Sequence, residues 1–281
     1  MAIIMDGKAL SSKVKEQIKQ EVSEITEKRK PKLAVVLVGN DPASSTYVAS
    51  KVKACELVGI ESIAKRMDES TTQEELVEVI KQLNEDQNVD GILVQLPLPK
   101  HLDEQEIMFM IDPNKDVDGF HPINVGKLHL KQKTFVPATP KGVMALIKEY
   151  NINLTGKKVL VIGRSHLVGR PVAQLLVDAN ATVTIAHSRT TNLEQLCYQS
   201  EVIVAAVGVM HLVQKEWLRQ GVILIDVGIH RTKENKLTGD ISPDCTDVAS
   251  YMTPVPKGVG PMTIAMLLEN TMQAYKMRNA L

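Results

Sequence analysis

Tyr47 and Lys51 are the first pair of residues in this 281-residue chain whose types and spacing could do chemistry. They lie four positions apart in a segment, residues 44–58, whose apolar spacing predicts a helix, so both side chains share one face. A phenol and an ammonium placed in this way can hold one substrate together. Taken alone, the pair is explained more simply as a surface lysine stacked on a tyrosine.

The Tyr-x-x-x-Lys spacing is also the signature of short-chain dehydrogenases, which is a competing interpretation. In those enzymes the pair follows the glycine-rich turn that binds the cofactor. Here Tyr47 precedes the candidate turn at Gly163 by 116 residues, so the order of the motifs excludes this interpretation.

Two further polar groups stand beside strong structural signals. Gln95 is the one polar side chain at the end of an apolar run, residues 89–98, which predicts a strand ended by prolines. Asp116 and Asp118 lie two residues apart in the loop sequence of residues 115–120. Taken alone, this loop could be a solvated turn or a poor calcium-binding loop, since it lacks the oxygen-ligand spacing of an EF-hand.

A strand, a turn opened by Gly163 and a helix opened by Pro171 make up residues 158–171. Such a turn directs backbone N–H groups and a helix N-terminus at a pyrophosphate. It departs from G-x-G-x-x-G, because Ser165 and Val168 occupy the second and third glycine positions and Gly169 comes one residue later. An ordinary tight turn of an α/β domain is the alternative.

The next predicted strand, residues 182–186, favours NADP over NAD. In NAD-binding domains an acidic residue near this point holds the ribose 2′-hydroxyl, whereas a 2′-phosphate needs cations and hydroxyls. The strand is followed by His187, Ser188, Arg189 and Thr190, with no acid. Arg164 is a second candidate for contact with the 2′-phosphate. The alternative interpretation of Arg189 is that it only caps the end of the strand in solvent.

Composition narrows the class of protein. Lys plus Arg and Asp plus Glu number 33 each, and this zero net charge argues against nucleic acid and anionic membranes as partners. Three Phe, five Tyr and one Trp require an aliphatic core. The longest apolar stretch, of the type of residues 202–210, is too short to span a bilayer. Three scattered cysteines and an N-terminus without a leader pattern indicate a cytoplasmic protein without a metal site.

The length and the periodicity predict two α/β domains. Predicted strands at 32–39, 61–67 and 89–98 alternate with helices at 44–58 and 72–84, which is typical of parallel βαβ units. Residues 112–140 are predicted to be loop-rich, and residues 140–150 helical. The pattern then restarts, with strands at 158–162, 182–186, 201–207 and 222–227 and helices at 171–179 and 193–197. Glycines 208 and 228 follow two of these strands, where a ring could approach the backbone. A helix from residue 262 is expected to return to the first domain.

Taken together, these residues resemble the methylenetetrahydrofolate dehydrogenase/cyclohydrolase family of the bifunctional FolD type. The resemblance spans essentially the whole chain, and its motifs are long. Lys257 departs from the pattern, because the family most often has glycine there. The matching blocks are VGNDPAS (38–44) with YVASK (47–51), GILVQLPLP (91–99), KDVDGF (115–120), GRS (163–165) with GRP (169–171), and TPVPKGVGPMT (253–263).

The resemblance implies a folate-binding catalytic domain, residues 1–120 plus 262–281, and a Rossmann-like NADP-binding domain, residues 140–261. Residues 121–139 would connect them, with a cleft between the domains. NADP would take hydride from 5,10-methylenetetrahydrofolate, and water would then open the methenyl product to 10-formyltetrahydrofolate. These are steps of one-carbon metabolism that serve purine, histidine and methionine synthesis.

The resemblance also assigns catalytic roles. Lys51 would be central to the hydrolytic step, which suits a lysine whose pKa is lowered or one that polarises water as a cation. Gln95 would orient Lys51, Asp118 would bind the amino-pyrimidine edge of the pterin, and Tyr47 would stack along the folate. Two alternatives stay open: a dehydrogenase without cyclohydrolase activity, and a non-catalytic NADP-binding module.

Two further sets of residues and an assembly follow from the same resemblance. A homodimer, formed through a strand or helix of the NADP domain, is the expected assembly, and no metal is expected. The folate side would be lined by Pro261, Met262 and Thr263, and the NADP contacts would be Gly163, Arg164, Ser165, Ser188, Arg189 and Ile229.

Overall fold

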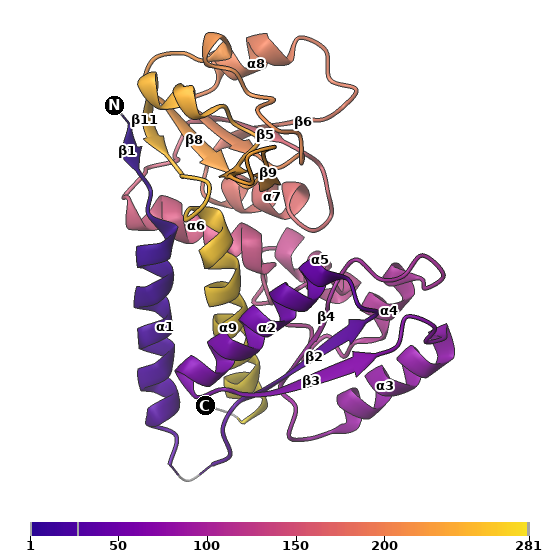
Figure 1. Ribbon diagram of the computed structural model, residues 1–281. Helices are drawn as coiled ribbons and strands as arrows, with labels where there is room; N and C mark the ends of the chain where they lie inside the picture. The colour runs from indigo at the N-terminus through magenta and orange to yellow at the C-terminus, as the bar shows by residue number, and fades with distance from the viewer. Residues whose placement is uncertain (1, 27, 280–281) are drawn as a thin grey trace. The chain divides into compact units, whose positions relative to one another are not determined.

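A computed structural model describes residues 2–26 and 28–279 of the chain (Figure 1). The chain divides into two compact units, each built from two stretches of sequence. The six-stranded unit contains Met1–Ser12 and Pro137–Thr263, and the three-stranded unit contains Lys13–Val136 and Ile264–Leu281. Both are α/β in class, as predicted. The sequence analysis placed residues 1–12 in the other domain, whereas the structure pairs β1 (Ile3–Ile4) with the larger sheet.

The three-stranded unit is organised around β2 (Lys32–Val38), which lies between β3 (Glu61–Met67) and β4 (Gly91–Val94). Both neighbours are parallel to β2. Because β2 is buried along nearly its whole length, its sequence is a continuous apolar run rather than an alternating one. The helices wholly within this unit are α2 (Pro42–Val58), α3 (Gln73–Glu85), α4 (Glu104–Met110) and α5 (Pro122–His129).

The six-stranded unit holds a parallel sheet in which the chain reverses direction across the sheet at β5 (Lys158–Ile162). After β5, the chain adds β6 (Thr182–Ala186) on one side and then returns to place β7 (Val202–Ala205) on the other. Ligands of such sheets bind outside the carboxyl ends of the strands at this switch point. In spatial order the strands are β1, β11 (Ala249–Met252), β8 (Val222–Asp226), β7 (Val202–Ala205), β5 (Lys158–Ile162) and β6 (Thr182–Ala186).

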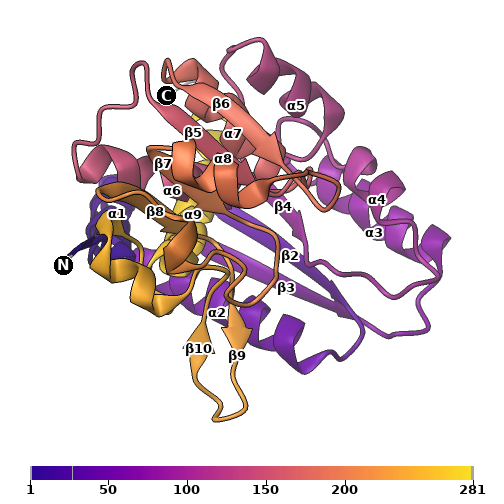
Figure 2. The same ribbon diagram turned by 90° about the horizontal axis from the view of Figure 1, so that it is seen from above.

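Helices and a small hairpin complete the six-stranded unit. The antiparallel hairpin of β9 (His230–Arg231) and β10 (Leu237–Thr238) extends from the loops that follow β8 (Figure 2). The helices are α6 (Ala138–Glu149), α7 (Gly169–Asp178), α8 (Leu193–Gln199) and two short 3-10 helices (Lys215–Trp217 and Pro243–Asp247).

The two long helices α1 (Gly7–Ser23) and α9 (Val259–Arg278) each begin in the six-stranded unit and end in the three-stranded one. Within the latter, Lys276 of α9 pairs with Glu21 of α1 at 2.6 Å. The buried Asn270 side chain donates hydrogen bonds of 2.8 Å to the carbonyls of Val117 and Val136. The predicted return of the C-terminal helix is therefore confirmed.

One predicted loop is partly wrong. Residues 112–140 are predicted to form a loop-rich connection, but the eight-residue helix α5 lies within them. Pro122 occupies the first turn of α5, where a missing N–H costs nothing, and the His121 side chain accepts a hydrogen bond from the Ile123 amide at 3.1 Å. None of the helices in residues 2–26 and 28–279 has both the length and the apolarity that a bilayer crossing requires.

Candidate active site

Lys51 and Gln95 come from different elements and meet in the three-stranded unit. Helix α2 starts where the Asp41 side chain accepts a hydrogen bond from the Ser44 amide, and this cap fixes the helix that carries Lys51. Gln95 directly follows β4, and its backbone N–H donates a hydrogen bond to the Val36 carbonyl at 2.8 Å. The Lys51 ammonium lies 2.9 Å from Gln95 Oε1. Because Gln95 Nε2 donates to the Leu96 carbonyl, only Oε1 is left to face Lys51.

Asp118 stands on a loop whose two preceding polar residues are structural. The Lys115 ammonium is fully buried and donates to three carbonyls at the end of α3, those of residues 83, 84 and 86, at 2.7 to 2.9 Å. The buried Asp116 carboxylate accepts hydrogen bonds from the His121 amide and the Asn124 side chain, both at 2.8 Å. The two carboxylates of this loop therefore divide their roles: Asp116 braces the loop, and Asp118 is left for a ligand.

Burial shifts the pKa values of Lys51 and Asp118 toward each other, and the attraction between their charges opposes both shifts. Burial lowers the pKa of the Lys51 ammonium, and the Asp118 charge partly opposes this shift. Burial also raises the pKa of the Asp118 carboxyl to about 6, against the opposing effect of Lys51, and the Asp116 charge adds to the rise. A lowered pKa makes the neutral amine, which is the form that accepts a proton, easier to reach, and this is the direction of shift that a general base needs.

Tyr47 lies one turn before Lys51 on α2, and its side chain is 51% exposed. The phenol thus presents an open aromatic surface on the helix that carries the lysine. A planar ligand that reaches Lys51 along α2 has this ring beside it, and stacking is the contact that such a ring offers.

The turn after β5 brings two glycines into close backbone contact in the six-stranded unit. Gly163 has φ +124°, and a side chain there would lie 2.3 Å from the Ala206 carbonyl at the end of β7. A side chain on Gly169 would lie 2.2 Å from the Gly163 carbonyl. In the G-x-G-x-x-G motif, the third glycine allows the helix to pack closely on the strand. Gly169 has this function here, although it stands one residue after the position of that glycine in the motif. Ser165 Oγ accepts from the amides of Val168 and Gly169, which caps the start of α7.

The turn after β6 is preorganised by its own side chains. Thr190 Oγ1 accepts from the His187 amide at 2.9 Å, and His187 Nδ1 accepts from the Arg189 amide at 3.1 Å. Ser188 and Arg189 are exposed on this turn, and Arg164 is exposed on the turn of the adjacent β5. One hydroxyl and two guanidinium groups are thus available at the carboxyl edge of two neighbouring strands, a set suited to a phosphate.

Three more predicted residues begin α9. The Met262 side chain is fully buried and lies against Gly142 of α6, so it belongs to the core of the six-stranded unit. Thr263 Oγ1 is 2.9 Å from Thr139 Oγ1, and Pro261 is half-buried. Ile229, by contrast, projects from the loop after β8 and is 49% exposed.

Two buried acids that the sequence patterns did not single out, Asp226 and Asp240, lie near the carboxyl ends of β7 and β8. Burial raises the pKa of the Asp226 carboxyl to about 6, although its hydrogen bonds from backbone amides oppose the rise. A signal was present, because Asp226 ends an otherwise apolar strand. The partners of both acids are mostly backbone amides, which leave no pattern of side chains in a sequence.

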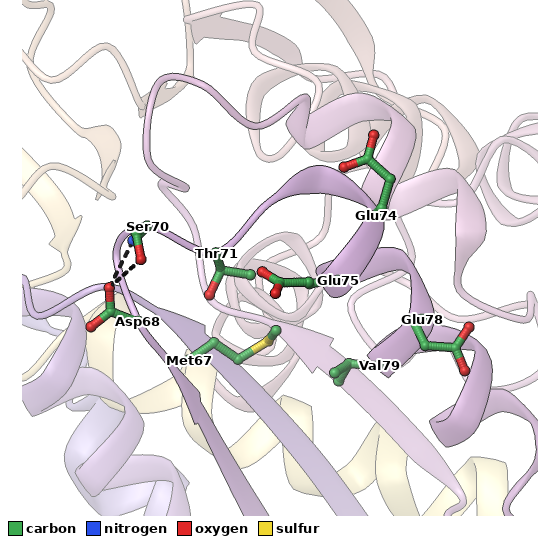
Figure 3. Close-up of a pocket in the computed structure, with 8 residues that line it drawn as sticks. All are labelled: Met67, Asp68, Ser70, Thr71, Glu74, Glu75, Glu78 and Val79. Atoms are coloured by element: carbon green, nitrogen blue, oxygen red, sulfur yellow. Dashed lines mark hydrogen bonds between the residues drawn. The ribbon is translucent and has the colours of Figure 1, made fainter.

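A separate open pocket of about 620 Å³ lies between the end of β3 and α3 (Figure 3). None of its lining residues is among the predicted site residues. Four of the eight are acidic, and the Glu75 carboxylate already accepts a hydrogen bond from the Thr72 amide in the capping box of α3. These carboxylates would repel an anionic folate or dinucleotide, so this pocket is not assigned to either.

Comparison with known families matches both parts of the chain. Residues 5–118 match the family model described as tetrahydrofolate dehydrogenase/cyclohydrolase, catalytic domain. Residues 137–279 match the corresponding NAD(P)-binding domain. The bifunctional protein FolD of Acetivibrio thermocellus is 52% identical over 279 residues, which cover 99% of this chain and 98% of the relative. FolD of Aliarcobacter butzleri is also 52% identical over 279 residues, covering 98% and 97%.

Solved structures give the same result. The bifunctional FolD methylenetetrahydrofolate dehydrogenase/cyclohydrolase of Campylobacter jejuni is 48% identical, with a TM-score of 0.98 and full coverage of both chains. The Trypanosoma brucei enzyme, solved with NADP cofactor and an inhibitor, is 35% identical, with a TM-score of 0.95 over 100% of this chain and 99% of that one.

Proposed function

This chain belongs to the tetrahydrofolate dehydrogenase/cyclohydrolase family, and from this premise we propose that Lys51, Gln95 and Asp118 form its folate site. The protein is a bifunctional enzyme: an NADP-dependent methylenetetrahydrofolate dehydrogenase and a methenyltetrahydrofolate cyclohydrolase. The observation that carries the assignment of residues is the 2.9 Å contact between Lys51 and Gln95, beside a carboxylate that its own loop leaves available.

The dehydrogenase step depends on placement. NADP, when bound, accepts the hydride that leaves the methylene carbon of the folate. Hydride transfer needs no acid or base from the protein, so the chain contributes by fixing the two reactants. The Asp118 carboxylate would accept two N–H bonds from the amino-pyrimidine edge of the pterin, and Tyr47 would stack along the substrate.

The hydrolytic step requires proton transfers, and Lys51 is placed to make them. Water attacks the methenyl carbon, and a neutral Lys51 amine takes one of its protons. The bond from this carbon to one ring nitrogen then breaks as that nitrogen receives the proton from the Lys51 ammonium, and the hydroxyl of the adduct releases its remaining proton to solvent as the formyl C=O forms. Gln95 Oε1 accepts one N–H of Lys51, which directs the amine's lone pair away from Gln95 and toward the substrate.

The NADP contacts are assigned to the carboxyl edge of β5 and β6. The close packing of Gly163 against Gly169 brings the start of α7 to the end of β5, so the N-terminus of this helix would face the pyrophosphate. The 2′-phosphate would be held by Arg164, Ser188 and Arg189. The turns after β5 and β6, residues 163–170 and 187–190, carry no acid that would instead bind the 2′-hydroxyl of NAD. Ser165 and Ile229 would complete the nucleotide site. The assignment of Pro261, Met262 and Thr263 to the folate stays a prediction from the family resemblance.

One assay tests the function directly. Purified enzyme is given methylenetetrahydrofolate with NADP, and NADPH and methenyl-folate are followed by their absorbance in the same cuvette. We expect NADPH to accumulate while methenyl-folate stays low, because the second activity consumes it. Lack of NADPH formation would contradict the proposed function, whereas a build-up of methenyl-folate would restrict it to a dehydrogenase.

We further propose that the enzyme is a homodimer formed through β6. This strand is the edge of the six-stranded sheet, and its Ile185 side chain is 42% exposed. Exposed Val177 on α7 and Tyr198 on α8 add apolar surface to the same unit. An open edge strand with apolar side chains is a natural pairing site for a second copy. Sedimentation velocity should give a dimer that Ile185→Lys converts to a monomer, and a monomeric native enzyme would refute this assembly.

A cytoplasmic location is part of the same proposal. The three cysteines are free and buried, and burial raises the pKa of each thiol to about 12, so none is poised for disulfide exchange. Cell fractionation should recover the dehydrogenase activity with the cytoplasmic fraction.

A further inference from the structure

A buried carboxylate, Asp240, joins the two loops that follow β7 and β8. Its Oδ2 accepts hydrogen bonds from the amides of Val207 at 2.8 Å and Gly208 at 3.1 Å, just after β7. Its Oδ1 is 2.7 Å from Nε2 of His230, which follows β8 in sequence. The Asp240 side chain is fully buried, so water does not replace these partners. A single side chain therefore holds both loops.

Asp226 fixes Asp240 in turn. The Asp226 carboxylate, at the end of β8, accepts from the amides of Gly228, Asp240 and Ile241 at 3.0, 3.0 and 2.9 Å. The backbone of Asp240 is thus anchored to the strand, and only its side chain reaches the neighbouring loop. This arrangement places the Asp240 carboxylate at a defined point between the ends of β7 and β8.

The consequence for Ile229 is specific. A side chain on Gly228 would lie 2.3 Å from Asp240 Oδ1, so glycine at this position lets the backbone close onto the carboxylate. The sequence analysis expected Gly228 to make room for a ring, but the structure shows that Asp240 fills this space. Ile229 lies between Gly228 and His230, both in contact with Asp240, while its own side chain stays exposed. Its position is therefore set from both sides.

These loops lie at the edge assigned to NADP. Strands β5, β7 and β8 are adjacent and parallel, so their carboxyl ends face the same side of the sheet. Gly163 at the end of β5 touches Ala206, directly before the Val207 amide that Asp240 holds. Burial of a carboxylate costs free energy unless hydrogen bonds satisfy it. Asp240 meets this requirement with bonds to both loops, and the same bonds hold the loops in place.

We propose that Asp240 is a positioning residue for NADP, which holds Ile229 and the Val207–Gly208 backbone in the geometry that binds the dinucleotide. This inference rests on the proposed function. It predicts an effect on the reaction that uses NADP and not on the hydrolysis of methenyl-folate, which uses none. A merely structural role would instead reduce both activities in parallel.

The test compares Asp240→Ala and Asp240→Asn with Asp244→Ala, a control at an exposed acid in the nearby 3-10 helix. The Kd of NADP is measured by calorimetry, and the cyclohydrolase is assayed on supplied methenyl-folate without NADP. For Asp240→Ala we expect the Kd and the KM for NADP to rise about 10-fold or more, as two amides lose their acceptor. The cyclohydrolase kcat should stay within about twofold, which is less than the loss of one hydrogen bond would cause, because this reaction uses no NADP.

Asp240→Asn keeps an acceptor for the two amides and should restore most of the NADP affinity. If Asp240→Ala does not fold, His230→Ala decides: it removes one partner of the Asp240 carboxylate and should raise the Kd of NADP about threefold, while Val207 and Gly208 remain held and the cyclohydrolase kcat is unchanged. An unchanged Kd in Asp240→Ala, or in His230→Ala where Asp240→Ala does not fold, or an equal loss of both activities, would overturn the proposal. Native enzyme that neither binds nor reduces NADP would instead overturn the proposed function itself.

Discussion

The Lys51 ammonium donates a hydrogen bond of 2.9 Å to the side-chain oxygen of Gln95, which lies 44 residues further along the sequence. The side-chain amide of Gln95 cannot rotate freely, because its nitrogen Nε2 donates to the Leu96 carbonyl at 2.6 Å. The direction of the amine is therefore set by β4 and the chain after it, although the lysine itself stands on α2. This relationship makes the chemistry of Lys51 separable from the rest of the site by mutation.

Lys51→Met should abolish the cyclohydrolase and spare the binding of NADP. The substitution keeps the aliphatic stem of the side chain and removes the proton acceptor, so we expect kcat for methenyl-folate hydrolysis to fall by about 10²-fold or more. Lys53→Met, an exposed lysine on the same helix, is the matched control. A large loss of NADP affinity in Lys51→Met would contradict the assignment of folate and nucleotide to different residues.

Gln95→Glu should move the pH profile of the cyclohydrolase to higher pH. A carboxylate in contact with Lys51 stabilises the ammonium and raises the pKa that burial lowers in the native enzyme. The neutral amine is then populated only at higher pH, so the rising limb of kcat shifts upward. Gln95→Leu, which removes the acceptor without adding charge, should lower kcat about 10-fold with no upward shift. Identical profiles for the native enzyme and Gln95→Glu would argue against Lys51 as the proton acceptor.

Low pH should lower kcat/KM for methylenetetrahydrofolate, because it protonates the Asp118 carboxylate. The pKa of its carboxyl is raised to about 6, chiefly by burial, so the ionised acceptor is lost as the pH falls through this value. We expect kcat/KM for methylenetetrahydrofolate to be flat above this pH and to decline below it. Asp118→Asn should lower kcat/KM about 100-fold or less, the range for hydrogen bonds to a charged group, and should remove the acidic limb. An acidic limb that persists in Asp118→Asn would assign it to another residue.

Arg189→Ala should reduce the preference for NADP over NAD. Loss of one charge-assisted contact to the 2′-phosphate predicts a change of about 10-fold in the ratio of kcat/KM values. Arg219→Ala is the control, because Arg219 precedes the start of β8 and lies at the amino edge of the sheet. If Arg189→Ala leaves the ratio unchanged while Arg164→Ala lowers it, the phosphate contact belongs to Arg164.

Lys257→Gly should stabilise the enzyme. Lys257 has φ +85°, in the left-handed region that costs a residue with a side chain about 1 kcal/mol or more relative to glycine. Thermal unfolding should therefore shift upward by about 2 °C. Asn151→Gly, at φ +51°, is the control and should gain less, since asparagine tolerates this region. A lower unfolding temperature for Lys257→Gly would show that the lysine side chain makes compensating contacts.

The sequence predicted those parts of the fold that depend on local patterns. The boundaries of β3 and β5 are as predicted, because a buried or paired strand needs a run of suitable side chains. The two-residue strand β1 was missed, since its pairing with β11 joins distant parts of the chain. The same contrast holds at the site. Lys51 and Gln95 lie in long motifs, but Asp240 acts through backbone amides that any sequence provides.

The interleaved composition of the two units has a consequence for synthesis. The three-stranded unit needs Ile264–Leu281, which the ribosome makes only after the whole six-stranded unit. Until then the loop before Asp118 lacks the Asn270 side chain that holds the Val117 carbonyl. The nascent chain therefore contains every residue of the six-stranded unit before the three-stranded unit is complete, and Lys51 gains its finished surroundings only after the last turns of α9 have been made.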